Sequence, residues 1–260
     1  MAAVVLLFVG TVWLSGFVIR GSYLFENCTL TERLENFRAF QADGALTGET
    51  ALWSEGKMRC FTATFLRSGE DKWEKPDVAD RLYGWLLPDD VYDEYRQAFT
   101  AALADGERFP VLLSPPEVTV SYEDSWGGER TYGGRRRHEG TDLMSSGSTT
   151  SRGVIAVVSA SDGVIEKKGW LKLGGYRLGI RGPHGAYYYS AHLDHYADGI
   201  YEGADVSAGQ IIGYMGDTGY GDEGTQGKFA VHLHFGIYIK VKQEEISINP
   251  FWILKKLEES

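Results

Sequence analysis

The stretch Val231-His232-Leu233-His234-Phe235 decides how this chain is interpreted, and it lies within a run, Phe229 to Ile239, in which small or polar residues alternate with apolar ones. Such alternation is typical of a half-buried β-strand, on which side chains two residues apart point to the same face. His232 and His234 therefore share one face with Gly236. The apolar residues share the other: Val231, Leu233, Phe235, Ile237 and Ile239. Two imidazoles beside a glycine indicate a metal site or a catalytic pair rather than a packed core.

A second motif, His138-Glu139-Gly140-Thr141-Asp142, precedes the first one in the chain. Zinc binds imidazole nitrogen and carboxylate oxygen at roughly 2.0–2.2 Å, and hydrolytic sites leave the fourth position for water. His138, Asp142 and His234 would supply such a ligand set. One carboxylate and two neutral imidazoles leave net positive charge on the ion, enough to lower the pKa of its water. The glycines around His138 favour a strand-to-loop turn there over a helix.

Two further histidines are candidates for proton transfer. His232 shares the strand face of His234, and His192 lies in a second strand-like run, Tyr187 to Leu193. Hydrolysis by an activated water needs a base and a donor that stabilises the oxyanion. Because no H-E-x-x-H motif is present, we expect His192 and His232 to divide these tasks, in an order that the sequence leaves open.

The two remaining histidines are weaker candidates. We expect His184, in the turn Arg181 to Gly185, to be exposed. His195 either supports the metal site from outside or lies in a solvated loop.

The organisation of the chain predicts an α+β protein. Residues 29–41 and 76–105 show helical spacing, the latter with a second helix starting at Pro88-Asp89-Asp90, so we expect a helical region over 24–115. From 118 to 251, short strand-like runs alternate with glycine- and aspartate-rich turns, which predicts an antiparallel β-sheet domain. Residues 250–259 are expected to form a short helix or tail.

Composition narrows the function. The chain has 260 residues, 43% of them hydrophobic, which is enough for a substantial core. Its net charge of -10 argues against a nucleic-acid binder. The run Arg135-Arg136-Arg137 is a local exception, either a solvated patch or a group that binds substrate carboxylates. Cys28 and Cys60 form no C-x-x-C motif and are expected to be buried thiols or, outside the cell, one disulfide.

Residues 2–19 contain no charged residue and are long enough to span a bilayer. We therefore expect residues 1–20 to be a single membrane anchor that holds an extracytoplasmic domain. The alternative is a poorly marked signal segment of a secreted protein.

Four segments together resemble the lysostaphin-type (LytM-like) zinc endopeptidases, over about residues 118 to 251. They are Trp126 to Leu143, Tyr189 to Leu193, Gly213 to Gly219 and His232 to Phe235. The resemblance implies a groove over an antiparallel sheet and cleavage of peptide cross-links or stems of bacterial peptidoglycan. It also implies Zn²⁺ held by His138, Asp142 and His234, with His192 and His232 as the catalytic pair.

Two departures from that family pattern stand out. Ser190-Ala191 separates the tyrosines from His192, and the loop Tyr220 to Ala230 is longer and more charged than usual. That loop would border the groove, so it bears on specificity. The rival interpretation is a non-catalytic envelope or sporulation scaffold that keeps this fold and binds a partner protein, and another is a peptidoglycan-binding module. The complete set of five site residues argues against both.

Overall fold

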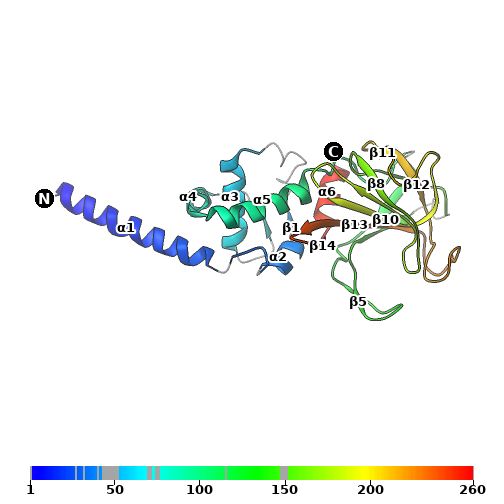
Figure 1. Cartoon of the computed structure of the whole chain (residues 1–260), viewed down its shortest axis with the longest axis horizontal. Helices are drawn as coiled ribbons and strands as arrows, with labels where there is room; N and C mark the ends of the chain where they lie inside the picture. The colour runs from blue at the N-terminus through cyan, green and yellow to red at the C-terminus, as the bar shows by residue number, and fades with distance from the viewer. Residues whose placement is uncertain are drawn as a thin grey trace. The chain divides into compact units, whose positions relative to one another are not determined.

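The computed structural model describes residues 2–26, 28–31, 33–39, 41–42, 53–68, 72–73, 77–114, 116–146 and 152–259. The described residues form two compact units, one up to Gln97 and one from Ala98 onward (Figure 1). The domain boundaries expected at residues 20, 115 and 118 stay predictions.

The first unit is helical. Its helices are α1 (Ala2–Phe25), α2 (Leu34–Ala39), α3 (Glu55–Ser68), α4 (Val78–Leu86) and the first part of α5 (Asp89–Leu103), with a short parallel pair β1 (Gln41–Ala42) and β2 (Lys72–Trp73). Helix α4 starts at a capping box, in which Asp77 and Asp80 each bond the other's backbone N–H. Buried rings of Phe37, Phe65 and Tyr95 pack together in this unit.

The sequence predicted α2, α4 and α5 but missed α3. Cys28 and Cys60 are both buried thiols. Within the part of the chain that the structure describes, no helix combines the length and the apolar character that crossing a membrane requires.

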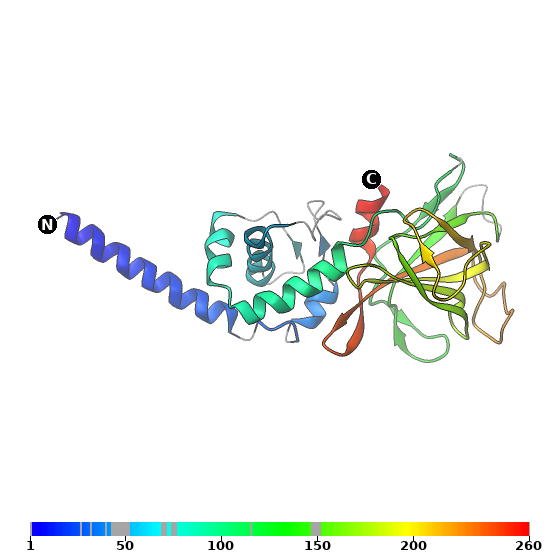
Figure 2. The ribbon, with the colours of Figure 1, turned by 45° about the horizontal axis from the view of Figure 1, so that its top comes forward.

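The second unit is built on one ten-stranded antiparallel sheet (Figure 2). Along its main path the order is β11-β8-β9-β10-β13-β6-β3, with β12 joining β10 to β7 and β14 paired to β13. The strands are β3 (Thr119–Ser121), β6 (Thr141–Ser146), β7 (Ala156–Val158), β8 (Gly163–Leu171), β9 (Gly175–Arg181), β10 (Tyr187–Tyr196), β11 (Asp205–Val206), β12 (Ile211–Met215), β13 (His232–Val241) and β14 (Glu244–Ile248).

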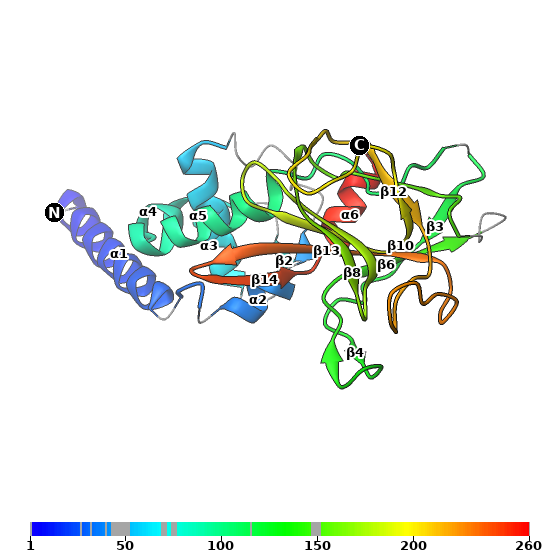
Figure 3. The same cartoon turned by 45° about the vertical axis from the view of Figure 1, so that its right-hand side comes forward.

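Two smaller elements complete the second unit. Strands β4 (Glu129–Arg130) and β5 (Arg136–Arg137) form a separate hairpin that projects from the sheet (Figure 3). Helix α6 (Phe251–Glu258) follows β14 and buries Ile253, Leu254 and Leu257. The predicted antiparallel sheet domain preceded by helices is confirmed.

The core lies under one face of β13. Leu233, Phe235, Ile237 and Ile239 are at most 1% exposed, as the alternation predicted. They lie on the same side of the sheet as buried residues of β8 and β9, which include Ile165, Leu178 and Ile180. The other face of β13 is consequently free to carry polar groups, and it carries the histidines.

Candidate metal centre and active site

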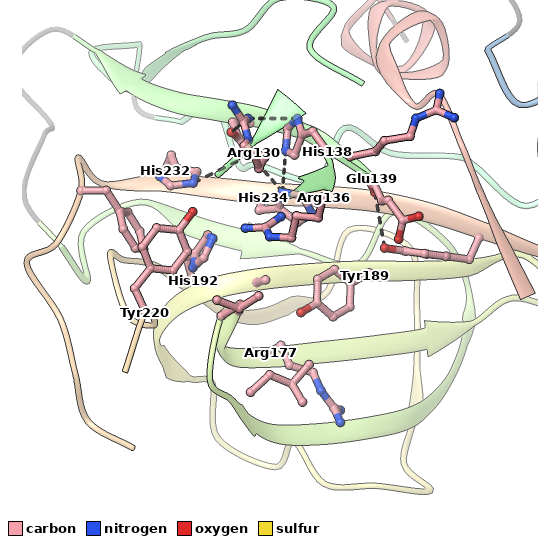
Figure 4. A pocket seen from close by; sticks show the side chains of 18 of the residues that line it. Arg130, Arg136, His138, Glu139, Arg177, Tyr189, His192, Tyr220, His232 and His234 are labelled. Carbon is pink, nitrogen blue, oxygen red and sulfur yellow. Dashed lines mark hydrogen bonds and ion pairs between the residues drawn. The ribbon is translucent and has the colours of Figure 1, made fainter. Parts of the chain in front are cut away.

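The register of three strands brings His138, Asp142 and His234 together. His234 on β13 lies directly opposite Asp142 on β6. His138 immediately follows β5, and its ring lies beside that of His234 (Figure 4). His138 Nε2 lies 3.0 Å from Asp142 Oδ1 and 3.0 Å from His234 Nδ1. His234 Nδ1 lies 2.9 Å from the same Asp142 Oδ1. One atom from each residue thus forms a compact, nearly equilateral group.

The size and chemistry of this group fit one zinc ion. Two atoms that each lie roughly 2.0–2.2 Å from an ion are about 3.3–3.6 Å apart at a tetrahedral angle. The observed separations of 2.9–3.0 Å are slightly shorter, as expected where the three atoms contact one another directly. Two imidazole nitrogens and one carboxylate oxygen are also the donors that zinc prefers.

The orientation of His138 is fixed from its far side. Its Nδ1 lies 3.0 Å from the backbone oxygen of Ser125. Arg130 Nη2 lies 3.0 Å from the same Nδ1. A carbonyl oxygen only accepts and a guanidinium only donates, so these two contacts require opposite tautomers of His138. The tautomer that donates from Nδ1 to Ser125 O has its lone pair on Nε2, the atom that faces Asp142 and His234, and this is the tautomer that metal binding through Nε2 requires.

Asp142 is held between these histidines and a cation. Arg130 Nη2 on β4 donates to Asp142 Oδ2 at 2.7 Å, which leaves Oδ1 for the group. Burial alone would raise the pKa of the Asp142 carboxyl, but hydrogen bonds with His138 and His234 hold that pKa far below its usual range. Burial also lowers the pKa of His234. A charged carboxylate beside a neutral imidazole is the state that metal binding requires.

His232 and His192 lie next to this group but outside it. The His192 ring centroid is 4.8 Å from that of His232 and 6.1 Å from that of His234. His232 Nε2 is 3.8 Å from Asp142 Oδ1. The two imidazoles of the His-Leu-His strand are therefore unequal: Nδ1 of His234 faces the candidate ligands, whereas His232 faces His192 (Figure 4).

Each of these two outer histidines is also tethered by a carbonyl oxygen. His192 Nδ1 donates to Thr218 O at 2.7 Å, and His232 Nδ1 donates to Ala230 O at 2.8 Å. Both rings consequently carry their proton on Nδ1 and keep Nε2 free to accept one. Burial, followed by the neighbouring His232 and His234, lowers the pKa of His192 well below its ordinary value, so this imidazole is neutral and can act as a base.

His192 reaches the site through a bulge in β10. The register of β10 against β9 shifts between Ser190 and Leu193, and His192 has a φ of 61°, a left-handed value that is uncommon for a residue with a side chain. Simple alternation would place His192 on the core side with Ser190, because Ala191 is the residue paired with His234. The bulge instead turns the imidazole toward the pocket, at a cost of about 1 kcal/mol or more in backbone strain.

The site lies in a pocket of about 730 Å³. Its floor contains Tyr189, which is paired with Gly179 on one side and Gly236 on the other. Tyr220 and Phe229, at the two ends of the loop noted in the sequence, pack on His192 with ring centroids at 6.1 and 4.6 Å.

The β4–β5 hairpin contacts that loop at the edge of the pocket. The Tyr132 ring stacks on Tyr220 at 4.1 Å, and the Tyr132 hydroxyl donates to Tyr220 O at 2.7 Å. Sequence reasoning missed Tyr132, Arg130 and Phe229 as site residues. Arg130 lies in the first motif segment, where its role depends on hairpin pairing that the short strands β4 and β5 do not reveal.

The remaining two histidines lie elsewhere. His184 is in a turn and 43% of its side chain is exposed, as expected, and its Nδ1 lies 2.7 Å from the buried Asp105. His195 is also exposed and stacks on Tyr214 at 4.5 Å. The expected exposure is observed, but His195 belongs to strand β10 rather than to a loop.

Comparisons with known proteins agree with this geometry. The sequence profile of peptidase family M23 matches residues 136–250. A Bacillus subtilis protein named L-Ala–D-Glu endopeptidase is 43% identical over 55% of this chain, and the chain spans 42% of its length. A Ruminococcus gnavus crystal structure, provisionally described as the glycyl-glycine endopeptidase lytM, is 36% identical with a TM-score of 0.69, covering 89% of this chain and 96% of that one. The catalytic domain of Staphylococcus simulans lysostaphin is 28% identical with a TM-score of 0.40, covering 52% and 92%.

Proposed function

We propose that this chain, which belongs to peptidase family M23, is a zinc endopeptidase that hydrolyses peptide bonds in the cross-links or stems of bacterial peptidoglycan. One observation carries the proposal. Three zinc-type ligand atoms lie within 2.9–3.0 Å of one another, and two further imidazoles with free Nε2 atoms lie beside them. A binding module or a scaffold needs no such second pair.

His138, Asp142 and His234 would hold the ion. When bound, Zn²⁺ supplies a Lewis acid that polarises the scissile carbonyl and lowers the pKa of water. The chain's own contribution is to fix these three side chains: Ser125 O orients His138, and Arg130 holds the outer oxygen of Asp142. Such outer partners set the orientation and basicity of the ligands.

His192 and His232 would move the protons. The two rings lie side by side next to the ligand group. The neutral imidazole of one can take the proton of the attacking water at Nε2, while the other, carrying a second proton as imidazolium, donates from Nε2 to the developing oxyanion. The carbonyl tethers at Thr218 and Ala230 keep a proton on Nδ1 of both rings, so Nε2 is the atom that gains and loses a proton. Proton return to the leaving amine follows from the same Nε2–H.

The test uses the full zinc-loaded chain and purified peptidoglycan. We expect soluble muropeptide fragments with new amino and carboxyl ends. His232→Ala should retain zinc and release none of these fragments, because its side chain lies outside the ligand group. Stoichiometric zinc without cleavage of any wall type would refute the proposal and favour a scaffold that binds an envelope protein.

The proposed substrate also determines where the protein would act. Peptidoglycan lies outside the cytoplasmic membrane, so we propose an extracytoplasmic peptidase unit. The anchor expected over residues 1–20 stays a prediction. Fractionation of cells that express the chain with and without residues 1–20 tests it, and equal recovery in the membrane fraction would rule out anchoring by that segment.

A further inference from the structure

We propose that Arg136 and Arg177 form a carboxylate-binding subsite in the pocket, so that the substrate carries a free carboxylate on a residue next to the scissile bond. This inference rests on the proposed function and specifies its substrate class. The names of the two relatives point to different bonds, an alanyl-glutamyl bond and a glycyl-glycine bond. Only the alanyl-glutamyl bond places an acidic residue at the cleavage point. The groups that line the pocket of this chain therefore indicate which of the two bonds it accepts.

The first arginine comes from the β4–β5 hairpin. Arg136 lies directly opposite Arg130 in the ladder, and both side chains line the pocket. Like charges at paired positions destabilise a hairpin unless each is compensated. Arg130 is compensated by Asp142 at 2.7 Å. Among the described residues, Arg136 Nε is buried and has no hydrogen-bond partner.

The second arginine comes from the floor of the groove. Arg177 is on β9, next to Leu178, which is fully buried in the core beneath the sheet. Alternation therefore directs Arg177 to the pocket side, and it lines the pocket. Its Nη1 is likewise buried without a hydrogen-bond partner within the described part of the chain. A buried guanidinium N–H without an acceptor is costly, and a bound anion would remove that cost.

Tyr189 connects the two arginines. Figure 4 shows its ring between Arg136 and Arg177. Arg136, Arg177 and Tyr189 all line the pocket. Burial raises the pKa of Tyr189, and the positive charges of Arg177 and Arg136 oppose that rise. A carboxylate placed there can accept from two guanidinium groups and from the phenol, which is a strong charge-assisted set.

No carboxylate of the pocket is a hydrogen-bond partner of Arg136 Nε or Arg177 Nη1 among the described residues. Four arginines and three carboxylates line the pocket. Two of those carboxylates are engaged by other groups: Asp142 by the histidines and Arg130, and Glu245 by Arg181 at 2.6 Å. In a chain whose net charge is -10, this wall of the pocket is locally cationic. Such a wall attracts and orients an anionic ligand.

The position of the subsite fits a residue adjacent to the cleaved bond. The Tyr189 ring centroid is 5.8 Å from that of His234, one of the three candidate ligands. Consecutive Cα atoms are roughly 3.8 Å apart, so a side-chain or α-carboxylate of the neighbouring residue reaches this distance. A glycyl-glycine bond offers no such group, whereas a stem peptide cut beside a glutamate does.

The experiment compares two peptides that differ by one group. One is an alanyl-D-glutamyl-lysine peptide with its free carboxylate, and the other carries the carboxamide instead. The zinc-loaded wild type should cleave the acid with a kcat/KM about 10- to 100-fold higher than the amide, the range expected for losing a hydrogen bond to a charged group. Arg136→Gln and Arg177→Gln should each remove most of that preference, chiefly through KM, because each should slow cleavage of the acid far more than cleavage of the amide.

Two controls separate charge from structure. Arg135→Gln removes a neighbouring arginine that is 84% exposed, pairs with Glu129 and does not line the pocket, so both peptides should be cleaved as by wild type. Arg177→Lys keeps the charge and should recover part of the preference. Zinc content and thermal melting of every variant should match wild type. The preference of the wild type for the acid tests the subsite even where a variant does not fold.

A binding measurement distinguishes failure of the subsite from failure of the enzyme. Calorimetric titration with the glutamyl-lysine product should show tighter binding of the acid than of its amide, lost in Arg136→Gln. Arginine-dependent binding without any hydrolysis would refute the proposed function and leave the subsite standing. Equal cleavage of acid and amide, equal effects of the arginine variants on both, or faster cleavage of a glycyl-glycine peptide would overturn the subsite.

Discussion

Gly140→Ala is the substitution that should dislodge a metal ligand without touching any ligand atom. Gly140 lies between His138 and Asp142, and a Cβ built on it would lie 2.7 Å from both Cε1 and Nε2 of His234 and 2.6 Å from Phe235 O. Its φ is not among the positive values of the chain, so the effect comes from contact rather than backbone strain.

The magnitude follows from how little His234 can move. Ordinary contact begins at 3.4 Å, so the imidazole or the new methyl group must shift by roughly 0.7 Å. The His234 backbone is held by pairing to Asp142 on β6 and Ala191 on β10. Working sites tolerate about 0.5 Å. We expect zinc affinity to fall by about 10- to 100-fold and stability by about 1–3 kcal/mol.

Zinc affinity is measured by competition with a chromophoric chelator, and stability by urea unfolding of the metal-free protein. Gly56→Ala is the matched control, because a Cβ at Gly56 meets nothing within 4 Å. It should leave zinc affinity unchanged and, because Gly56 is in helix α3, it should not lower stability but raise it by up to about 1 kcal/mol. Zinc affinity within twofold of wild type in a folded Gly140→Ala protein would refute the argument that this glycine makes room for the ligand.

Three further outcomes are expected. His234→Ala should lose stoichiometric zinc, whereas His232→Ala should keep it and lose activity by about 10²- to 10⁴-fold; metal analysis beside a cleavage assay decides, and zinc loss in His232→Ala would contradict the unequal roles. Asp105→Ala deprives the backbone N–H groups of His184 and Ala186 of their acceptor and should cost about 2–4 kcal/mol, seen as a lower urea midpoint with an unchanged slope. Tyr132→Phe removes the hydrogen bond to Tyr220 O and should speed amide exchange in the 220–230 loop with zinc content unchanged; exchange at the wild-type rate would show that the ring stack alone holds the loop.

The sequence predicted the part of the site that depends on regular strands. Alternation places His232 and His234 on the face opposite a core whose residues are almost completely buried, and the strand prediction over Phe229 to Ile239 is confirmed with β13 beginning at His232. Where the strands pair regularly, the spacing of residues along the sequence shows on which face of the sheet each side chain lies. The meeting of His138, Asp142 and His234 then follows from the pairing of β6 with β13.

Features that depend on irregular backbone could not be predicted in this way. Alternation would assign His192 to the core face, and only the left-handed φ at that residue reverses the assignment. Arg136 and Arg130 become neighbours through a hairpin with strands of two residues, too short to give a periodic signal. Helix α3 was missed because residues 60 to 66 are buried on every side, Thr62 and Thr64 included, so the segment does not show the one-sided apolar pattern of a surface helix.

Because of the bulge in β10, metal binding and catalysis depend on different strands and can be changed by separate mutations. The three candidate ligands depend on β6 and β13, whereas the position of His192 depends on one extra residue in a neighbouring strand. Deleting His192 would restore regular pairing and remove the strained φ together with the imidazole, with the ligand group left in place. A one-residue deletion would thus leave the metal-binding group intact and remove a proton-transfer group, a short evolutionary route from a peptidase to a protein that binds metal and peptide without cleaving the peptide.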